Sequence, residues 1–213
     1  MNQKSYGQFC GFARALEIVG DRWALMIVRD LLVGPKRFSD LRDGLPGIPT
    51  NILSARLKQL EAAQIVDRHA LPRPPGGVAY ELTARGRDLE DSVVAIGRWG
   101  AHMLDAPRPN EIVTTDSIAM ALRTTFRPES AHGVRGRIVL HVDEIVVHAI
   151  VDEARVTVGR GSLENADLVI FASPAIKAVM SGEMTPREAL ASGEIHITGS
   201  RRLFDRFAKM FRI

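Results

Sequence analysis

The sequence lacks the features that mark secreted and membrane proteins. Its single cysteine, Cys10, cannot form a disulfide within the chain, which suits a reducing compartment. No run approaches the roughly 18 uninterrupted apolar residues that a membrane span requires. The first residues, MNQKS, also lack the hydrophobic stretch of a signal peptide. We therefore expect a cytoplasmic protein with no membrane partner.

The chain also has little excess of one sign of charge over the other. The formal net charge is +3 over 213 residues, which by itself is too small to indicate a polyanionic partner. The distribution is uneven, however, because residues 34–58 hold five basic and two acidic side chains, and residues 68–87 hold four and one. These two segments are the candidates for contact with an anion.

The composition predicts a folded chain of two domains. Apolar residues make up 46% of the sequence and charged residues 25%, which is ordinary for a globular protein of this length. Two prolines in the stretch DAPRPN, residues 105–110, indicate a short stiff connector. We predict an α+β protein with a helix-rich domain at 1–105, a linker at 106–111 and a mixed domain at 112–213.

A helix-turn-helix is predicted in the first basic segment. Phe38 and Leu41 lie on the inner face of a short helix, and a turn containing Pro46 and Gly47 follows. In the next helix, residues 50–63, apolar side chains recur at helical spacing, at positions 53, 57 and 60. The opposite face is small and polar, so its backbone could approach base edges in a major groove. The alternative is a solvated amphipathic helix that only covers the core.

The following segment favours the DNA-binding interpretation. Residues 65–68 and 78–82 read as two strands around a tip at 72–77 that is rich in proline and glycine. Such a wing could bring cations to a minor groove or to the phosphate backbone. The candidate DNA contacts are Arg37, Thr50, Asn51, Ser54, Ala55, Arg56, Lys58, Arg68 and Arg73.

A long helix is predicted after the wing, from residue 84 to about residue 104, with Thr83 as its cap. Leu89, Val93, Ile96 and Met103 fall on one face of it. Together with the first helix, around residues 12–19, this face could form a dimer interface.

This half of the chain resembles the HxlR family of winged-helix transcriptional regulators. The resemblance implies a homodimer on a pseudo-palindromic operator of double-stranded DNA, with half-sites roughly 34–36 Å apart. It rests on Cys10, Ala13, Ala15 and Leu16; residues 20–23; Ile27, residues 29–32, Gly34, Pro35, Arg37, Phe38 and Leu41; residues 45–48; Leu53, Ser54, Arg56, Leu57 and Leu60; and Tyr80, Leu82, Thr83, Gly86, Trp99 and Gly100.

Two positions depart from the pattern of that family. Pro49 stands where a serine often precedes the recognition helix, so the cap must come from Thr50 or from backbone geometry. Gln64 stands where a glycine is common, at a point where a left-handed conformation is convenient. We expect slight strain there.

Cys10 has two interpretations. It matches a cysteine that some members of the family use as a redox switch, which would require a thiolate stabilised by a cation or by a helix start. The favoured interpretation is a small, partly buried residue of the core, because unpaired cysteines pack as hydrophobes.

Residues 112–213 predict a sheet with helices. A helix carries Ile118, Leu122 and Phe126 on one face after a cap at Thr115 or Asp116. Short β-branched runs at 137–142, 145–151, 155–158 and 166–172 predict a meander, and residues 194–198 a fifth strand. Helices are expected to begin after residues 173 and 185, and a last one at 201–211.

This second half resembles the sterol-carrier-protein-like lipid-binding domain, which implies a mainly antiparallel five-stranded sheet and an apolar cavity. The resemblance rests on residues 167–170, Ser173, Met180, Gly182, Met184, Pro186, Ala189, Gly193, Ile195, Ile197 and Gly199. The ordinary alternative for its large side chains is core packing. The candidate walls for a small hydrophobic ligand are Val179, Met180, Met184, Phe204, Phe207 and Phe211.

Catalysis finds no support in the sequence. The stretch GRGS at 159–162 lacks the downstream glycine of a nucleophile elbow, and no phosphate-binding loop is present. His141 and His148 lack a third ligand, so we expect no metal and no cofactor. The sequence predicts a DNA-binding regulator whose second domain could sense a hydrophobic ligand. The rival is a hydrophobic-ligand carrier whose winged helix serves protein interaction or dimerisation.

Overall fold

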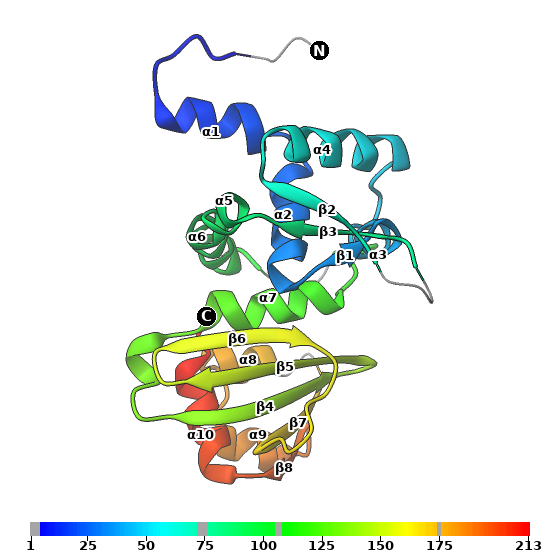
Figure 1. The fold of residues 1–213 in the computed structure, drawn as a ribbon. Helices are drawn as coiled ribbons and strands as arrows, with labels where there is room; N and C mark the ends of the chain where they lie inside the picture. Colours follow the sequence, from blue (N-terminus) through cyan, green and yellow to red (C-terminus); the bar gives the residue numbers. More distant parts are fainter. Residues whose placement is uncertain (1–4, 72–75, 105–107, 174–175) are drawn as a thin grey trace. The chain divides into compact units, whose positions relative to one another are not determined.

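The chain forms two compact units, Met1–Val93 and Val94–Ile213, in the computed structural model (Figure 1). The structure describes residues 5–71, 76–104, 108–173 and 176–213. The division falls inside a helix, α6, whereas the sequence places the end of the first domain at residue 105. The boundaries at 105 and 112 stay a prediction.

The first unit is a winged helix-turn-helix. Its three-stranded antiparallel sheet has the order β1-β3-β2, with Arg68 opposite Tyr80 in the pairing of β2 and β3. Its elements are α1 (Gly11–Val19), α2 (Ala24–Val33), β1 (Lys36–Arg37), α3 (Phe38–Gly44), α4 (Thr50–Ala62), β2 (Val66–Ala70), β3 (Val78–Leu82), α5 (Ala84–Arg87) and the start of α6 (Glu90–Ala101).

The core of this unit explains the position of α4. Leu53, Leu57 and Leu60 are all buried, as their helical spacing predicts. The apolar helix α2 supplies Ile27 and Leu31 to the same core. Burying a leucine side chain stabilises a fold by roughly 1.5–3 kcal/mol. This row therefore fixes which face of α4 points outward.

The helix predicted at 84–104 is interrupted. Thr83 does cap its start, since its hydroxyl accepts a hydrogen bond from the backbone N–H of Gly86 at 3.0 Å. Helix α5 ends at Arg87. The N–H of Leu89 donates to the carbonyl of Gly86 at 3.2 Å, three residues back, and α6 begins at Glu90. Periodicity could not show this break because the apolar residues of the predicted face begin at Leu89, so none of them lies before it.

The second unit contains the predicted five-stranded sheet, in the order β6-β5-β4-β7-β8. Figure 1 shows α8, α9 and α10 on one side of it. Its elements are α7 (Thr115–Thr125), a short 3-10 helix at Pro128–Ser130, β4 (Arg135–Val142), β5 (Ile145–Asp152), β6 (Arg155–Arg160), β7 (Leu168–Ala172), α8 (Ile176–Ser181), α9 (Pro186–Ser192), β8 (Ile195–Gly199) and α10 (Arg201–Met210).

The expected four-strand meander is wrong in its last member. Strands β4, β5 and β6 do follow one another, but β7 pairs in parallel with β4 instead of with β6. Leu168 and Ile170 of β7 are fully buried, which an inner position between β4 and β8 provides and an edge position would not.

The cap of α7 also differs from the prediction. Thr114, and neither Thr115 nor Asp116, caps the helix by accepting a hydrogen bond from the N–H of Ser117 at 3.2 Å. Asp116 is instead buried and accepts a hydrogen bond from Nε of Arg160 in β6 at 2.7 Å. This ion pair joins α7 to the edge of the sheet.

Gln64 is held in a left-handed conformation, with φ of 58°, immediately after α4. A side chain in this region costs energy that glycine does not. We predict that Gln64→Gly raises the free energy of unfolding by roughly 0.5–1 kcal/mol, measured by urea denaturation. The control is Ala63→Gly, because Ala63 has a φ of −83° and gains nothing from glycine. A loss of stability in Gln64→Gly would contradict the strain.

Candidate nucleic-acid interface

The outward face of α4 collects most of the predicted DNA contacts. Thr50, Asn51 and Lys58 are exposed, while Ser54 and Ala55 are half-buried. These side chains are short or flexible, so the helix backbone itself is accessible along this face. The arrangement has the shape and chemistry required of a helix that enters a major groove.

The start of α4 is open. Pro49 occupies the N-cap position with φ of −66°, and no side chain caps the helix there. Thr50 is the first helical residue and does not cap the helix, so neither Pro49 nor Thr50 supplies a side-chain cap. An uncapped helix start presents backbone N–H groups and the positive end of the helix dipole, both of which attract phosphate.

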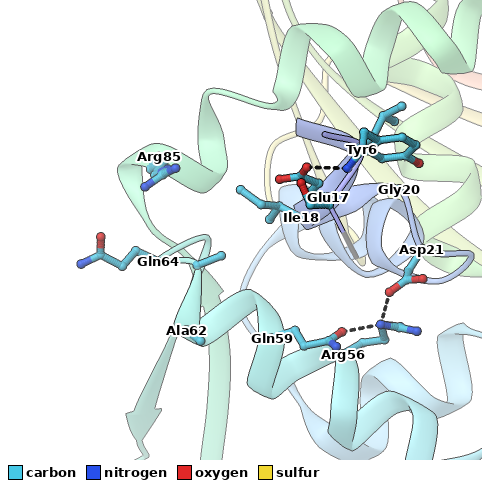
Figure 2. Close-up of a pocket in the computed structure, with 13 residues that line it drawn as sticks. Tyr6, Glu17, Ile18, Gly20, Asp21, Arg56, Gln59, Ala62, Gln64 and Arg85 are labelled. Atoms are coloured by element: carbon cyan, nitrogen blue, oxygen red, sulfur yellow. Dashed lines mark hydrogen bonds and ion pairs between the residues drawn. The ribbon is translucent and has the colours of Figure 1, made fainter. Parts of the chain in front are cut away.

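Arg56 does not extend toward the outward face. Its guanidinium forms an ion pair with Asp21, at the corner between α1 and α2, and donates to the side-chain oxygen of Gln59 (Figure 2). Its side chain is only 21% exposed, against 49% for Asp21. The sequence placed Arg56 at the flank as a phosphate contact. The structure shows it tying α4 to the corner of α1 and α2.

The three-stranded sheet of the first unit carries two further predicted contacts, one on β1 and one on β2. Arg37 is half-buried, and its guanidinium lies against the backbone of Gly77, where a Cβ would come within 2.8 Å of Nη1. The backbone N–H of Arg37 donates to Asp40 at 2.9 Å. Arg68 is exposed on β2. Arg73, at the predicted tip, lies outside the described residues.

The predicted cavity walls in the second unit mostly belong to its core. Phe204, Phe207 and Phe211 are fully buried, and the rings of Phe207 and Phe211 lie 4.7 Å apart. Met180 is also buried. A groove of about 440 Å³ lies nearby, and its lining includes only two of the six predicted walls. Its residues include Val179, Met184, Pro186, Ala208, Lys209 and Arg212.

Cys10 is exposed at the N-cap position of α1, so the expected packing into the core does not explain it. The backbone N–H groups of Ala13 and Phe12, at the start of α1, lower the pKa of its thiol. The geometry therefore supplies the helix start that a stabilised thiolate requires.

The two histidines considered as metal ligands make contacts that need no metal. The ring of His141 stacks on Phe171 with centroids 4.5 Å apart, and Nδ1 of His148 lies 3.0 Å from the carbonyl of Gly161. Within the described parts of the chain, no three His, Cys, Asp or Glu side chains gather as metal ligands would. Over the same residues, no helix has both the length and the apolar character to cross a membrane.

Comparison with known proteins decides the family. A family model described as HxlR-like helix-turn-helix matches residues 18–108. An uncharacterised helix-turn-helix transcriptional regulator of Synechocystis is 34% identical over 99 residues, covering 46% of this chain and 73% of the relative. The chain belongs to the HxlR-like family.

Two further proteins match a similar share of the chain. The regulator YvaP of Bacillus subtilis is 36% identical over 94 residues, which is 44% of this chain and 87% of YvaP. A solved structure described as the redox regulator HypR in its oxidized form is 33% identical, covers 46% of this chain and 100% of that chain, and gives a TM-score of 0.43. The relatives are regulators of transcription, a class that is generally not enzymatic.

The Asp21–Arg56 pair is the feature of this site that sequence reasoning missed. Asp21 lies in the turn between α1 and α2, and Arg56 lies in α4, 35 positions later in the sequence. No short-range spacing rule applies to such a pair. The charge count of residues 34–58 included Arg56 as an available cation. Its pairing reduces the number of cations in that segment that can meet phosphate.

We predict that the thiol of Cys10 titrates below the ordinary pKa of cysteine, because two backbone N–H groups stabilise its thiolate. The rate of alkylation by iodoacetamide, measured against pH, should therefore have a lower midpoint in the folded protein than in urea. The control is Ser162→Cys in a Cys10→Ser background, which places a thiol on an exposed loop. Equal midpoints for the two thiols would contradict the prediction.

Proposed function

We propose that the protein is a homodimeric transcriptional regulator that inserts α4 into the major groove of double-stranded DNA. The single observation that carries this proposal is the division of α4 into a buried leucine row and an outward face of small polar and basic residues. Membership of the HxlR-like family supports the DNA-binding role.

The proposed contacts follow from the side chains on that face. Asn51 and Ser54 can hydrogen-bond to base edges, and Ala55 offers a methyl group to thymine. Thr50 and the open start of α4 suit a phosphate, as does the ammonium group of Lys58. Arg37 on β1 and Arg68 on β2 are proposed to contact the DNA backbone. Arg73, outside the described residues, is proposed as a third such contact from its place in the sequence. Arg56 is best assigned to positioning α4, because Asp21 holds its guanidinium.

Exposed apolar side chains support a dimer. Phe9 and Phe12, at the start of α1 in the first unit, are exposed. Ile96, Trp99 and Met103, on and just after α6, are exposed in the second. Side chains of this size are depleted from the surfaces of monomers when they gather in patches. A second copy of the chain would cover them and place two α4 helices on half-sites roughly 34–36 Å apart.

Residues 112–213, which lie within the second unit, are proposed as a sterol-carrier-like domain that senses a small hydrophobic ligand. Its five-stranded, mainly antiparallel sheet and the groove beside Val179 and Met184 support this role. A tenfold change in operator affinity needs about 1.4 kcal/mol of differential ligand binding between two states. Titrating fatty acids while measuring DNA affinity tests the coupling.

We predict that Lys58→Ala and Arg68→Ala each weaken DNA binding and flatten its salt dependence by about one unit per lost phosphate contact. Fluorescence anisotropy with a labelled duplex of about 30 base pairs, long enough for two half-sites, provides the measurement. Arg202→Ala is the matched control, since Arg202 is exposed on α10 in the second unit.

Two outcomes would count against the proposal. Absence of duplex binding by the unsubstituted protein would favour the carrier interpretation, in which the winged helix serves protein interaction or dimerisation. Equal losses in Lys58→Ala and Arg202→Ala would mean that binding depends on net charge and not on the face of α4.

A further inference from the structure

A pocket of about 810 Å³ lies in the first unit, behind the carboxyl-terminal half of α4 (Figure 2). Helix α1 and residues 5 and 6 bound it on one side, and α4 and the start of α5 bound it on the other. This volume is within the range of small-molecule sites, roughly 300–1,000 Å³. The DNA-facing residues Asn51 and Ser54 do not line it, so a ligand could occupy it while α4 faces a duplex.

The wall of this pocket is partly apolar. Tyr6, Leu16 and Ile18 contribute hydrocarbon surface, and Ala62 and Ala63 continue it along the end of α4. Such a surface suits the body of an organic molecule better than a lone inorganic ion.

The carboxylates of the pocket are already engaged. Glu17 accepts a hydrogen bond from the backbone N–H of Tyr6 at 2.9 Å and another from Arg14 at 3.0 Å. The Tyr6 N–H, more than Arg14, lowers the pKa of Glu17, which therefore stays ionised at neutral pH. Asp21 is paired with Arg56. Neither carboxylate is free to attract a cationic ligand.

The cations of the pocket are less fully satisfied. Arg85, at the start of α5, is exposed and has no ion pair among the residues that the structure describes. Nε of Arg56 is buried and has no hydrogen-bond partner within the described chain. Figure 2 shows Arg85 and Gln64 on the side of the pocket away from Asp21 and Arg56. The unmatched charge is therefore positive.

We propose that this pocket binds a small organic anion, with its acidic group on Arg85 and its apolar body along α1 and the end of α4. Arg56 and Gln59, which line the pocket, belong to the proposed DNA-reading helix. A ligand beside them would bind better to one position of α4 than to another and so would change DNA affinity. The coupling rests on the proposed DNA-binding function, whereas the binding site does not.

Isothermal titration calorimetry on the whole 213-residue chain tests the site. The probes are benzoate, 2-naphthoate and indole-3-acetate, each compared with its neutral amide. We expect at least one acid to bind at least tenfold more tightly than its amide, and Arg85→Ala to weaken that acid at least tenfold. The matched control is Arg87→Ala on the same short helix, whose guanidinium is paired with Glu81 outside the pocket, and it should change binding less than twofold.

Three results would overturn the inference: no acid binding more tightly than its amide, equal effects of Arg85→Ala and Arg87→Ala, or binding lost in Lys209→Ala instead. The last would place the anion in the groove of the second unit. Fluorescence anisotropy of the labelled duplex, measured with the same acid present, separates the proposed anion site from the proposed DNA-binding function. Arg85-dependent acid binding without any duplex binding would leave the site intact and reject the regulator. Duplex binding without acid binding would do the reverse.

Discussion

Burial of the leucine row of α4 is the interaction on which the rest of the first unit depends. Leu53, Leu57 and Leu60 lie in the core, which leaves one face of the helix for solvent or for a partner. The ion pair between Arg56 and Asp21 adds a second fixed point, at the corner of α1 and α2. A helix held in this way can present short polar side chains without losing its orientation.

The buried row of α4 also links the pocket of the first unit to the outward face of that helix. The pocket beside Arg56 is lined by the carboxyl-terminal half of α4, and Asn51 and Ser54 lie nearer the other end. A rigid helix transmits a small displacement along its length, so pressure at the pocket can alter the fit at the outward face.

Much of the fold could be predicted because local rules determine it. Periodicity located α4 and its buried row, and a missing glycine identified the left-handed Gln64. Two short runs around a tip rich in proline and glycine predicted the strands of the wing. The predicted five-stranded sheet is also present, since short β-branched runs indicated four of its strands.

The failures involve contacts between residues far apart in the chain. The parallel pairing of β7 with β4 depends on which neighbours bury Leu168 and Ile170, and no strand carries that information alone. The pairing of Arg56 with Asp21 is of the same kind. Helical spacing also cannot distinguish the lining of a hollow from a filled core. Phe204 and Phe207 of α10 are fully buried, and their role as cavity walls stays a prediction.

The most direct measurement of the central claim is the chemical accessibility of the outward face of α4 with and without DNA. In a Cys10→Ser background, Ser54→Cys places a small reactive thiol on that face, and Ser162→Cys places one on the second unit. Saturating duplex should slow alkylation by N-ethylmaleimide at position 54 at least tenfold and leave position 162 unchanged. Full reactivity at position 54 in a protein that has bound duplex would contradict the account.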